Sequence, residues 1–336
     1  MVVKVFYLLK MSLIIAASSA AIYLVIAVGL ILSQWPAPVA PGKTLNFTSL
    51  SNDDDQDGAE NKLVSYRARD GADLALRHFP ADEATAPLAV IVHGSGWHGA
   101  AYVPIAEHLS TQCGYEVLLP DLRGHGVAPQ TRGDVGYIGP LEDDLADLIA
   151  AYRQSGQPVY MIGHSSGGGL VVRFAGGEHG GLLNKAVLLS PFLKHDAPTM
   201  RNNAGGWSHV LVRRIIGLTM LNKVGVRVLN GLTVIQFRFP QEVLDGPQGM
   251  TATPQYSYRL NTSFAPRGDY LADIAKLPPF LLLAGAEDEA FDAAKFQPVM
   301  SAANERGTYE ILPGIGHLDI IGEKSALLRT CAFLKT

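Results

Sequence analysis

The fold of this 336-residue chain is decided by the stretch from Pro158 to Gly168, Pro-Val-Tyr-Met-Ile-Gly-His-Ser-Ser-Gly-Gly. The first five residues predict a buried strand, and the next five fit the pattern Gly-x-Ser-x-Gly. A helical segment over 165–176 follows directly. A strand, this pattern and a helix in that order predict a sharp turn that exposes Ser165. Gly163 and Gly167 suit such a turn because they carry no side chain to clash with it.

Strands and helical segments alternate on both sides of this turn. The apolar run Leu88–Val92 is typical of a strand buried on both faces of a parallel sheet. Alternation of this kind predicts βαβ units. The predicted fold class is therefore α/β, with a mainly parallel eight-stranded sheet and helices on both faces. The predicted strands are 63–69, 73–79, 88–92, 115–119, 158–162, 185–189, 279–284 and 308–312. The predicted helices are 101–112, 141–154, 165–176, 290–304 and 324–334.

Residues 191–276 break this rhythm and predict a cap inserted over the sheet. The catalytic core is then made of residues 62–190 and 277–336. Two strongly apolar stretches lie within the cap, Val210–Leu221 and Val224–Phe237. The second is rich in Val, Leu and Phe and can be extended rather than helical.

A serine hydroxyl is a poor nucleophile without a histidine base and an acid that orients the base. With a nucleophile turn of this kind the three residues follow one another as serine, acid and histidine. His317 follows the last acidic candidates, in the loop after the strand 308–312. The acid is expected just after the strand 279–284, in Gly285-Ala286-Glu287-Asp288-Glu289. Asp288 is the preferred residue, and the neighbouring Glu287, Glu289 and Asp292 are interpreted as solvated loop charges.

An oxyanion hole needs backbone N–H groups aimed at the developing negative charge. Ser166, directly after the nucleophile, is one expected donor. Ser95 is the other, in the loop His93-Gly94-Ser95-Gly96 after the strand 88–92, where Gly94 lets the backbone approach a substrate closely. His93 is interpreted as structural, hydrogen-bonded under the loop. Trp97 and His98, which follow Gly96, either line the pocket or lie at the surface.

A second glycine-rich loop, Asp121-Leu122-Arg123-Gly124-His125-Gly126, lacks the spacing of a phosphate-binding loop and is interpreted as setting the shape of the site. Together with the Gly-x-Ser-x-Gly turn, Gly285-x-x-Asp288 and Gly316-His317, it resembles the α/β-hydrolase superfamily. Within it, the chain resembles the serine aminopeptidase S33, monoacylglycerol lipase and lysophospholipase-like group over about residues 63–334. The resemblance implies that Asp288 is the triad acid and that the insertion is a lid. It is far less specific for the substrate, because this fold supports many hydrolytic activities.

Residues 1–35 predict a membrane anchor, because 11–33 carry no charge and about 23 helical residues span a hydrocarbon core of about 30 Å. Lys4 and Lys10 precede this run, so the N-terminus is expected in the cytoplasm and the catalytic domain on the outer, periplasmic or lumenal side. The alternative is a cleaved signal peptide and a secreted protein, although a signal peptide usually has only about 7–15 apolar residues. Residues 36–61 are predicted to be a solvated linker.

The net charge and the cysteine content limit the partners and cofactors that this protein is expected to bind. A net charge of −4 gives no reason to expect a nucleic acid partner. The two cysteines, Cys113 and Cys331, lack metal-ligand spacing and either form one disulfide in an oxidising compartment or remain small buried residues. No metal or organic cofactor is expected. The predicted function is hydrolysis of a lipid-like carboxylic ester. The alternatives are an aminopeptidase and a non-catalytic binding protein.

Overall fold

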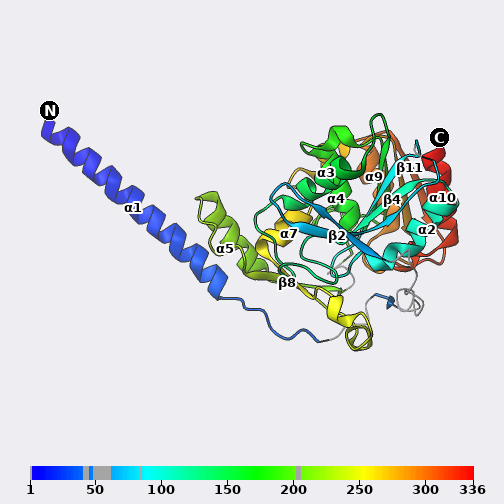
Figure 1. Cartoon of the computed structure of the whole chain (residues 1–336). Helices are drawn as coiled ribbons and strands as arrows, with labels where there is room; N and C mark the ends of the chain where they lie inside the picture. The colour runs from blue at the N-terminus through cyan, green and yellow to red at the C-terminus, as the bar shows by residue number, and fades with distance from the viewer. Residues whose placement is uncertain (1, 41–44, 48–61, 84, 202–205) are drawn as a thin grey trace.

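The computed structural model describes residues 2–40, 45–47, 62–83, 85–201 and 206–336 (Figure 1). Its main sheet has eight strands in the order β1-β2-β4-β3-β5-β6-β10-β11. The six strands from β4 to β11 are parallel, and β1 and β2 extend the sheet antiparallel. The predicted α/β fold is confirmed. The strands are β1 (Leu63–Arg67), β2 (Asp73–Phe79), β3 (Leu88–Val92), β4 (Glu116–Pro120), β5 (Val159–His164), β6 (Lys185–Leu189), β10 (Phe280–Gly285) and β11 (Gly307–Leu312).

Helices cover both faces of this sheet. All residues of β3, β5 and β10 are buried, as expected for strands between two helical layers. One face carries α2 (Val103–Thr111) and α10 (Lys324–Lys335), and a disulfide joins Cys113 beside α2 to Cys331 in α10. The other face carries α3 (Pro140–Tyr152), α4 (Ser166–Gly176) and α8 (Tyr270–Ala275).

The segment between β6 and β10 contains a second, three-stranded antiparallel sheet in the order β7-β8-β9. Within Val224–Phe237 only the last five residues are extended, and 224–232 form turns. The predicted helix 290–304 is shorter and is split into η7 and α9. The elements are β7 (Ser208–Val210), β8 (Thr233–Phe237), β9 (Gln255–Ser257), α5 (Val212–Lys223), α6 (Gln241–Leu244), α7 (Tyr258–Phe264), α9 (Phe296–Ser301), and the 3-10 helices η3 (Gly99–Tyr102), η4 (Gly180–Leu182), η6 (Gly249–Thr251), η7 (Ala293–Lys295) and η8 (Asp319–Ile321).

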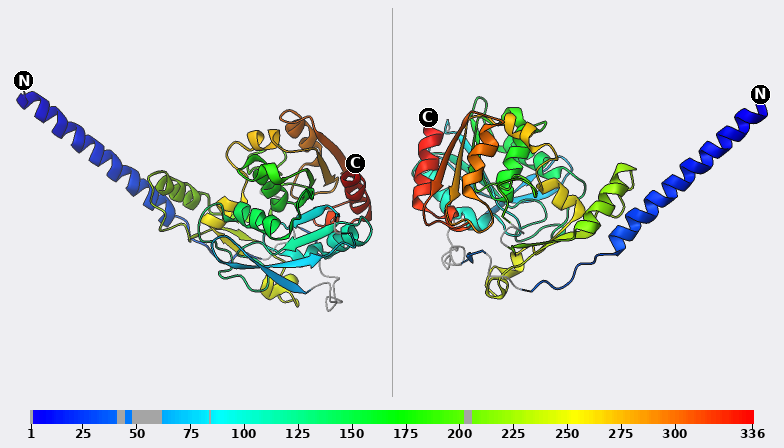
Figure 2. Two further views of the ribbon diagram at one scale, coloured as in Figure 1. Left: turned by 45° about the horizontal axis from the view of Figure 1, so that its top comes forward. Right: turned by 180° about the vertical axis from the view of Figure 1, so that it is seen from behind.

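The N-terminal helix α1 (Val2–Leu32) projects away from the α/β body in all views (Figure 2). It is the one helix in the described part of the chain that is long and apolar enough to cross a membrane. It starts before the predicted apolar run and includes Lys4 and Lys10. Only its C-terminal third contacts the rest of the protein, through α5 (Figure 1).

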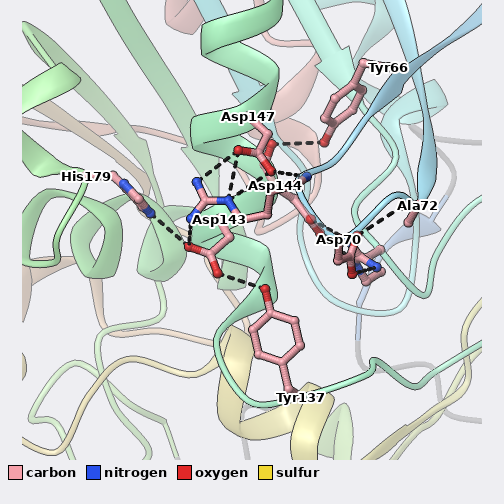
Figure 3. A network of polar contacts seen from close by, with 10 residues as sticks. Tyr66, Asp70, Ala72, Tyr137, Asp143, Asp144, Asp147 and His179 are labelled. Atoms are coloured by element: carbon pink, nitrogen blue, oxygen red, sulfur yellow. Dashed lines mark hydrogen bonds and ion pairs between the residues drawn. The ribbon is translucent and has the colours of Figure 1, made fainter.

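Charged side chains tie the edge hairpin β1–β2 to α3 and to the loop after β4 (Figure 3). Arg123 forms ion pairs with Asp144 of α3 at 2.6 Å and with Asp70 of the hairpin turn at 2.9 Å. Arg69 forms ion pairs with Asp143 and Asp147 of α3. Because Asp144 is largely buried, loss of Arg123 leaves its carboxylate an uncompensated charge. The loop 121–126 is therefore fixed to the edge hairpin and to α3 through Arg123.

Candidate active site

The turn between β5 and α4 places Ser165 in a conformation that an L-residue rarely adopts, with φ 53° and ψ −123°. Such backbone costs on the order of 1–3 kcal/mol and persists only when its surroundings impose it. Close approach by backbone imposes it here. A Cβ at Gly163 would lie 2.5 Å from the carbonyl oxygen of Gly167, and one at Gly167 would lie 2.2 Å from that of Val92. No larger residue fits at Gly163 or Gly167, because its Cβ would collide with neighbouring backbone.

The structure brings Ser165, His317 and Asp288 together. Nε2 of His317 lies 3.0 Å from Oγ of Ser165, and its Nδ1 lies 3.0 Å from Oδ2 of Asp288. The three residues follow β5, β11 and β10. Carboxyl ends of parallel strands share one edge of a sheet, which is why loops far apart in sequence meet there.

Asp288 is held as a carboxylate. Its burial raises the pKa, but the charge and hydrogen bond of His317 outweigh this, and the pKa falls to about 2. The N–H groups of Ala290 and Phe291 add two hydrogen bonds to Oδ1, at 2.9 and 2.8 Å. With only 1% of Asp288 exposed, these donors fix the carboxylate so that Oδ2 faces the imidazole.

The acids next to Asp288 are not all solvated loop charges. Oε2 of Glu289 accepts a hydrogen bond from the backbone N–H of His317 at 2.8 Å, so Glu289 positions the loop that carries the histidine. Asp292 caps η7 by accepting from Ala294 N–H. The interpretation of Glu289 as a solvated loop charge was wrong, because its partner is known only once the chain is folded, whereas the exposed bond of Asp292 is compatible with a loop charge.

Two buried tyrosines hold the loop 93–96. The N–H of Gly94 donates to Oη of Tyr102 at 2.9 Å, and the N–H of Gly96 donates to Oη of Tyr256 at 2.6 Å. Ser95 lies between these fixed points and lines the same cavity as Ser165. The other predicted oxyanion donor, Ser166, is the first residue of α4. Helix N-termini offer N–H groups without intrahelical partners, as this role requires.

His93 has the structural role predicted for it. It is fully buried, its Nε2 accepts the N–H of Leu122 at 3.0 Å, and its Nδ1 lies 2.8 Å from the carbonyl oxygen of Gly94. Burial lowers the pKa of His93 to about 4, so the ring is neutral at physiological pH. His98 is also buried and bonds to Thr251, whereas Trp97 lines the cavity.

A hydrogen-bonded chain missed by the sequence analysis connects the two sides of the site. Oη of Tyr102 lies 2.8 Å from Nδ1 of His164, and Nε2 of His164 lies 2.9 Å from the carbonyl oxygen of His317. Burial, together with the charge of His317, lowers the pKa of His164 to about 3. The neutral ring donates to one partner and accepts from the other. The only sequence signal was the position of His164 within Gly-x-Ser-x-Gly, directly before the serine.

The cavity beside Ser165 is narrow, at about 30 Å³, which is room for a water molecule or two. Its walls are mostly apolar and come from the core, from Trp207 before β7, and from the linker. Leu45 and Phe47 of the linker are each only 7% exposed, so this part of residues 36–61 is not a solvated spacer. The lining residues are Leu45, Phe47, Gly94, Ser95, Trp97, Ala101, Tyr102, His164, Ser165, Trp207, His317, Leu318 and Ile321.

Residues 84–325 match the family described as serine aminopeptidase, S33. The chain belongs to this family. Among curated proteins it is similar to the non-heme haloperoxidase of Rhodococcus erythropolis, with 26% identity over 61% of this chain and 77% of the relative. It is also 26% identical to the monoglyceride lipase of Saccharomyces cerevisiae, over 40% of this chain and 48% of the lipase. Apart from the haloperoxidase, the chain spans less than half the length of the curated relatives it matches.

Solved structures agree on the fold. A soluble variant of the monoglyceride lipase from Saccharomyces cerevisiae, in complex with a substrate analogue, matches 82% of this chain and 92% of the lipase with a TM-score of 0.62 and 19% identity. A putative aryl esterase from Burkholderia cenocepacia matches with a TM-score of 0.57 and 18% identity, over 82% of this chain and 98% of the esterase. These structures show the fold, and the family match with the curated monoglyceride lipase confirms the predicted enzyme class, a carboxylic ester hydrolase.

Proposed function

We propose that this protein is a membrane-anchored serine esterase that hydrolyses a lipid-like ester of the monoacylglycerol or lysophospholipid type. One observation carries the proposal. Ser165, His317 and Asp288 form a continuous hydrogen-bonded chain at the wall of an apolar cavity. A nucleophile, a base and an orienting acid in this order are the requirements of acyl transfer.

The reaction has two steps. Nε2 of His317 takes the proton of Ser165 as Oγ attacks the ester carbonyl, and Asp288 stabilises the imidazolium that forms. The backbone N–H groups of Ser95 and Ser166 hold the oxyanion. The imidazolium then gives its proton to the departing alcohol, leaving an acyl group on Oγ. In the second step His317 deprotonates a water molecule as it attacks the acyl carbon. The imidazolium returns this proton to Oγ as the acyl bond breaks, which releases the carboxylic acid and regenerates Ser165.

The apolar lining of the cavity favours an acyl chain over a polar substrate. In the present state the cavity is too small for such a chain. Phe47 stands against Trp207 and Phe239, with ring centroids 5.5 and 5.6 Å apart, and closes this space from the linker side. We therefore expect Leu45 and Phe47 to move when substrate enters. The monoglyceride lipases among the relatives support an acylglycerol as the substrate class.

An aminopeptidase needs an anionic group that recognises the amine of its substrate. Glu242 and Asp245, the two cap acids noted in the sequence, are exposed and lie outside the described lining of the cavity. The described lining residues include no carboxylate, which favours the ester. An assembled triad likewise favours catalysis over a purely binding role.

The same proposal places the catalytic domain on the outer side of the membrane, with α1 retained and its N-terminus in the cytoplasm. The disulfide between Cys113 and Cys331 supports an oxidising compartment. Retention is supported by contacts between α1 and the cap. Oη of Tyr23 donates to the carbonyl of Met220 at 2.9 Å, and Gly217 of α5 lies against Ile31. A cleaved signal peptide would leave that face of α5 uncovered.

The proposal is tested with the full-length protein in lipid nanodiscs, using p-nitrophenyl esters of increasing acyl length, a monoacylglycerol, and aminoacyl p-nitroanilides. We expect hydrolysis that rises with acyl length and is lost in Ser165→Ala, with the unfolding temperature retained. Preference for the anilides would instead establish the peptidase. Activity that survives in Ser165→Ala would remove Ser165 as the nucleophile.

A further inference from the structure

Helices α1 and α5 form an antiparallel pair outside the α/β body (Figure 1). At the base of the pair Arg213 of α5 donates to the carbonyl of Ser33 at 2.8 Å. Further along, Gly217 approaches Ala27 and Ile31 so closely that a Cβ there would lie 2.5 Å from the carbonyl oxygen of Ala27. Contact at a glycine lets two helix backbones approach each other closely. Helix α5 therefore follows α1 back toward the N-terminus instead of covering the sheet.

The far end of α5 is exposed and apolar. Residues 223–228, Lys-Val-Gly-Val-Arg-Val, are all exposed, and Val228 is 86% exposed. We call these six residues the cap tip. Val224 and Val226 are 54% and 37% exposed, and the two cations of the cap tip, Lys223 and Arg227, stand beside these valines. Apolar side chains mixed with cations are typical of segments that lie at the boundary between headgroups and acyl chains.

The position of the cap tip along α1 follows from helix geometry. Tyr23 bonds to Met220, and Lys223 lies about one turn further toward the N-terminus of α1, level with about Ala20. Lys10, an exposed charge on α1, is about ten residues away from that level. At about 1.5 Å per residue, the cap tip and Lys10 are about 15 Å apart along the helix axis.

A bilayer's hydrocarbon core is about 30 Å thick, about twice this separation. If the cap tip stayed outside the core, Lys10 would lie about 15 Å deep, near the centre of the bilayer, where a charge is most costly. If Lys10 stood at the inner boundary of the core, the cap tip would lie about 15 Å inside the outer boundary. An intermediate position places Lys10 about 7 Å inside the inner boundary of the core and the cap tip about 7 Å inside the outer boundary. At that depth long Lys and Arg side chains still extend to the headgroups. Tilting α1 shortens the separation of Lys10 and the cap tip along the bilayer normal, so both would lie deeper in the core.

We infer that the cap tip is a second membrane-contacting element, in which Val224, Val226 and Val228 enter the acyl-chain region of the outer leaflet while Lys223 and Arg227 bind lipid phosphates. This inference rests on α1 spanning the membrane, as the proposed function holds. The cap is then attached to the bilayer at two points, through α1 and through its own tip. Because β8, which follows the cap tip, pairs with β7, and Trp207 directly before β7 lines the cavity, one small sheet connects the cap tip to the wall of the catalytic cavity.

The test uses the full-length protein in liposomes of phosphatidylcholine and phosphatidylglycerol. Three variants with one added cysteine, Val228→Cys, Met250→Cys and Ile15→Cys, each carry a nitroxide spin label on that residue, because the native cysteines are occupied by their disulfide. Met250 is the matched control, because it is an apolar cap residue of similar exposure, 83% against 86%, on η6 rather than beside α1. Ile15 reports on α1 itself. Relaxation by oxygen, which concentrates in acyl chains, is compared with relaxation by a water-soluble nickel complex.

We expect the ratio of oxygen to nickel relaxation at Val228 to exceed that at Met250 severalfold and to approach that at Ile15. A lipid-like ratio at Ile15 with a water-like ratio at Val228 would overturn the inference and leave the anchor standing. A water-like ratio at Ile15 would overturn the anchor, and the inference with it. Hydrolysis of a water-soluble ester by each labelled variant shows that the domain remains folded.

Discussion

Replacing Asp288 by Asn tests the candidate triad at the residue whose role is least evident from sequence. The two side chains have nearly the same shape, so Oδ1 of the Asn still accepts from the N–H groups of Ala290 and Phe291. The other atom changes from an acceptor to an N–H donor facing Nδ1 of His317. The imidazole must then accept at Nδ1 and carry its proton on Nε2, where it can no longer take the proton of Ser165.

The expected loss follows from this tautomer change. The corresponding exchange in a serine protease lowers kcat about 10⁴-fold, which is about 5.5 kcal/mol of transition-state stabilisation. The assay is hydrolysis of p-nitrophenyl butyrate at pH 7 with Asp292→Asn as control, since Asp292 caps η7 and does not touch His317. If Asp288→Asn keeps more than a tenth of the wild-type kcat, Asp288 does not orient the base.

The same substitution alters the dependence of stability on pH. The pKa of Asp288 falls from 3.8 to about 2 on folding, so its ionisation stabilises the folded protein above about pH 4. That contribution, about 2 kcal/mol, is lost as the pH falls through about 2. Urea denaturation between pH 5 and 2 should show the wild type losing about 2 kcal/mol more than Asp288→Asn. Parallel curves would contradict the depressed pKa.

Three further substitutions test other parts of the structure. Gly167→Ala places a Cβ 2.2 Å from a backbone oxygen and should destabilise the protein by about 3 kcal/mol or more, measured by urea denaturation, whereas Gly181→Ala meets nothing within 4 Å and should change little. Phe47→Ala removes two aromatic contacts of about 0.5–1.5 kcal/mol each and should lower KM for p-nitrophenyl butyrate about fivefold; a higher KM would make Phe47 part of the binding wall. Cys113→Ser with Cys331→Ser should cost about 2–4 kcal/mol, and unchanged stability would mean that the disulfide does not form.

Glu289 and Tyr102 show why part of the site escapes sequence reasoning. Local patterns report what a residue does to its own turn or strand, and neither residue has a pattern that points to its partner. Glu289 bonds to His317, 28 positions away, and Tyr102 bonds to His164, 62 positions away. Leu45 and Phe47 lie in a polar, proline-rich segment whose composition predicts a solvated linker and gives no sign that these two apolar side chains are buried.

The sequence by itself determined the α/β fold, the order of its eight strands along the chain and the serine turn, because each depends on hydrophobic periodicity and on glycines spaced a few residues apart. It also indicated the order of serine, acid and histidine. Only the tertiary structure decided that Ser165, His317 and Asp288 meet, that two tyrosines fix the loop of Ser95, and that α5 lies along α1. Those contacts join segments up to about 200 residues apart, and their geometry depends on how whole strands and helices pack rather than on any local pattern.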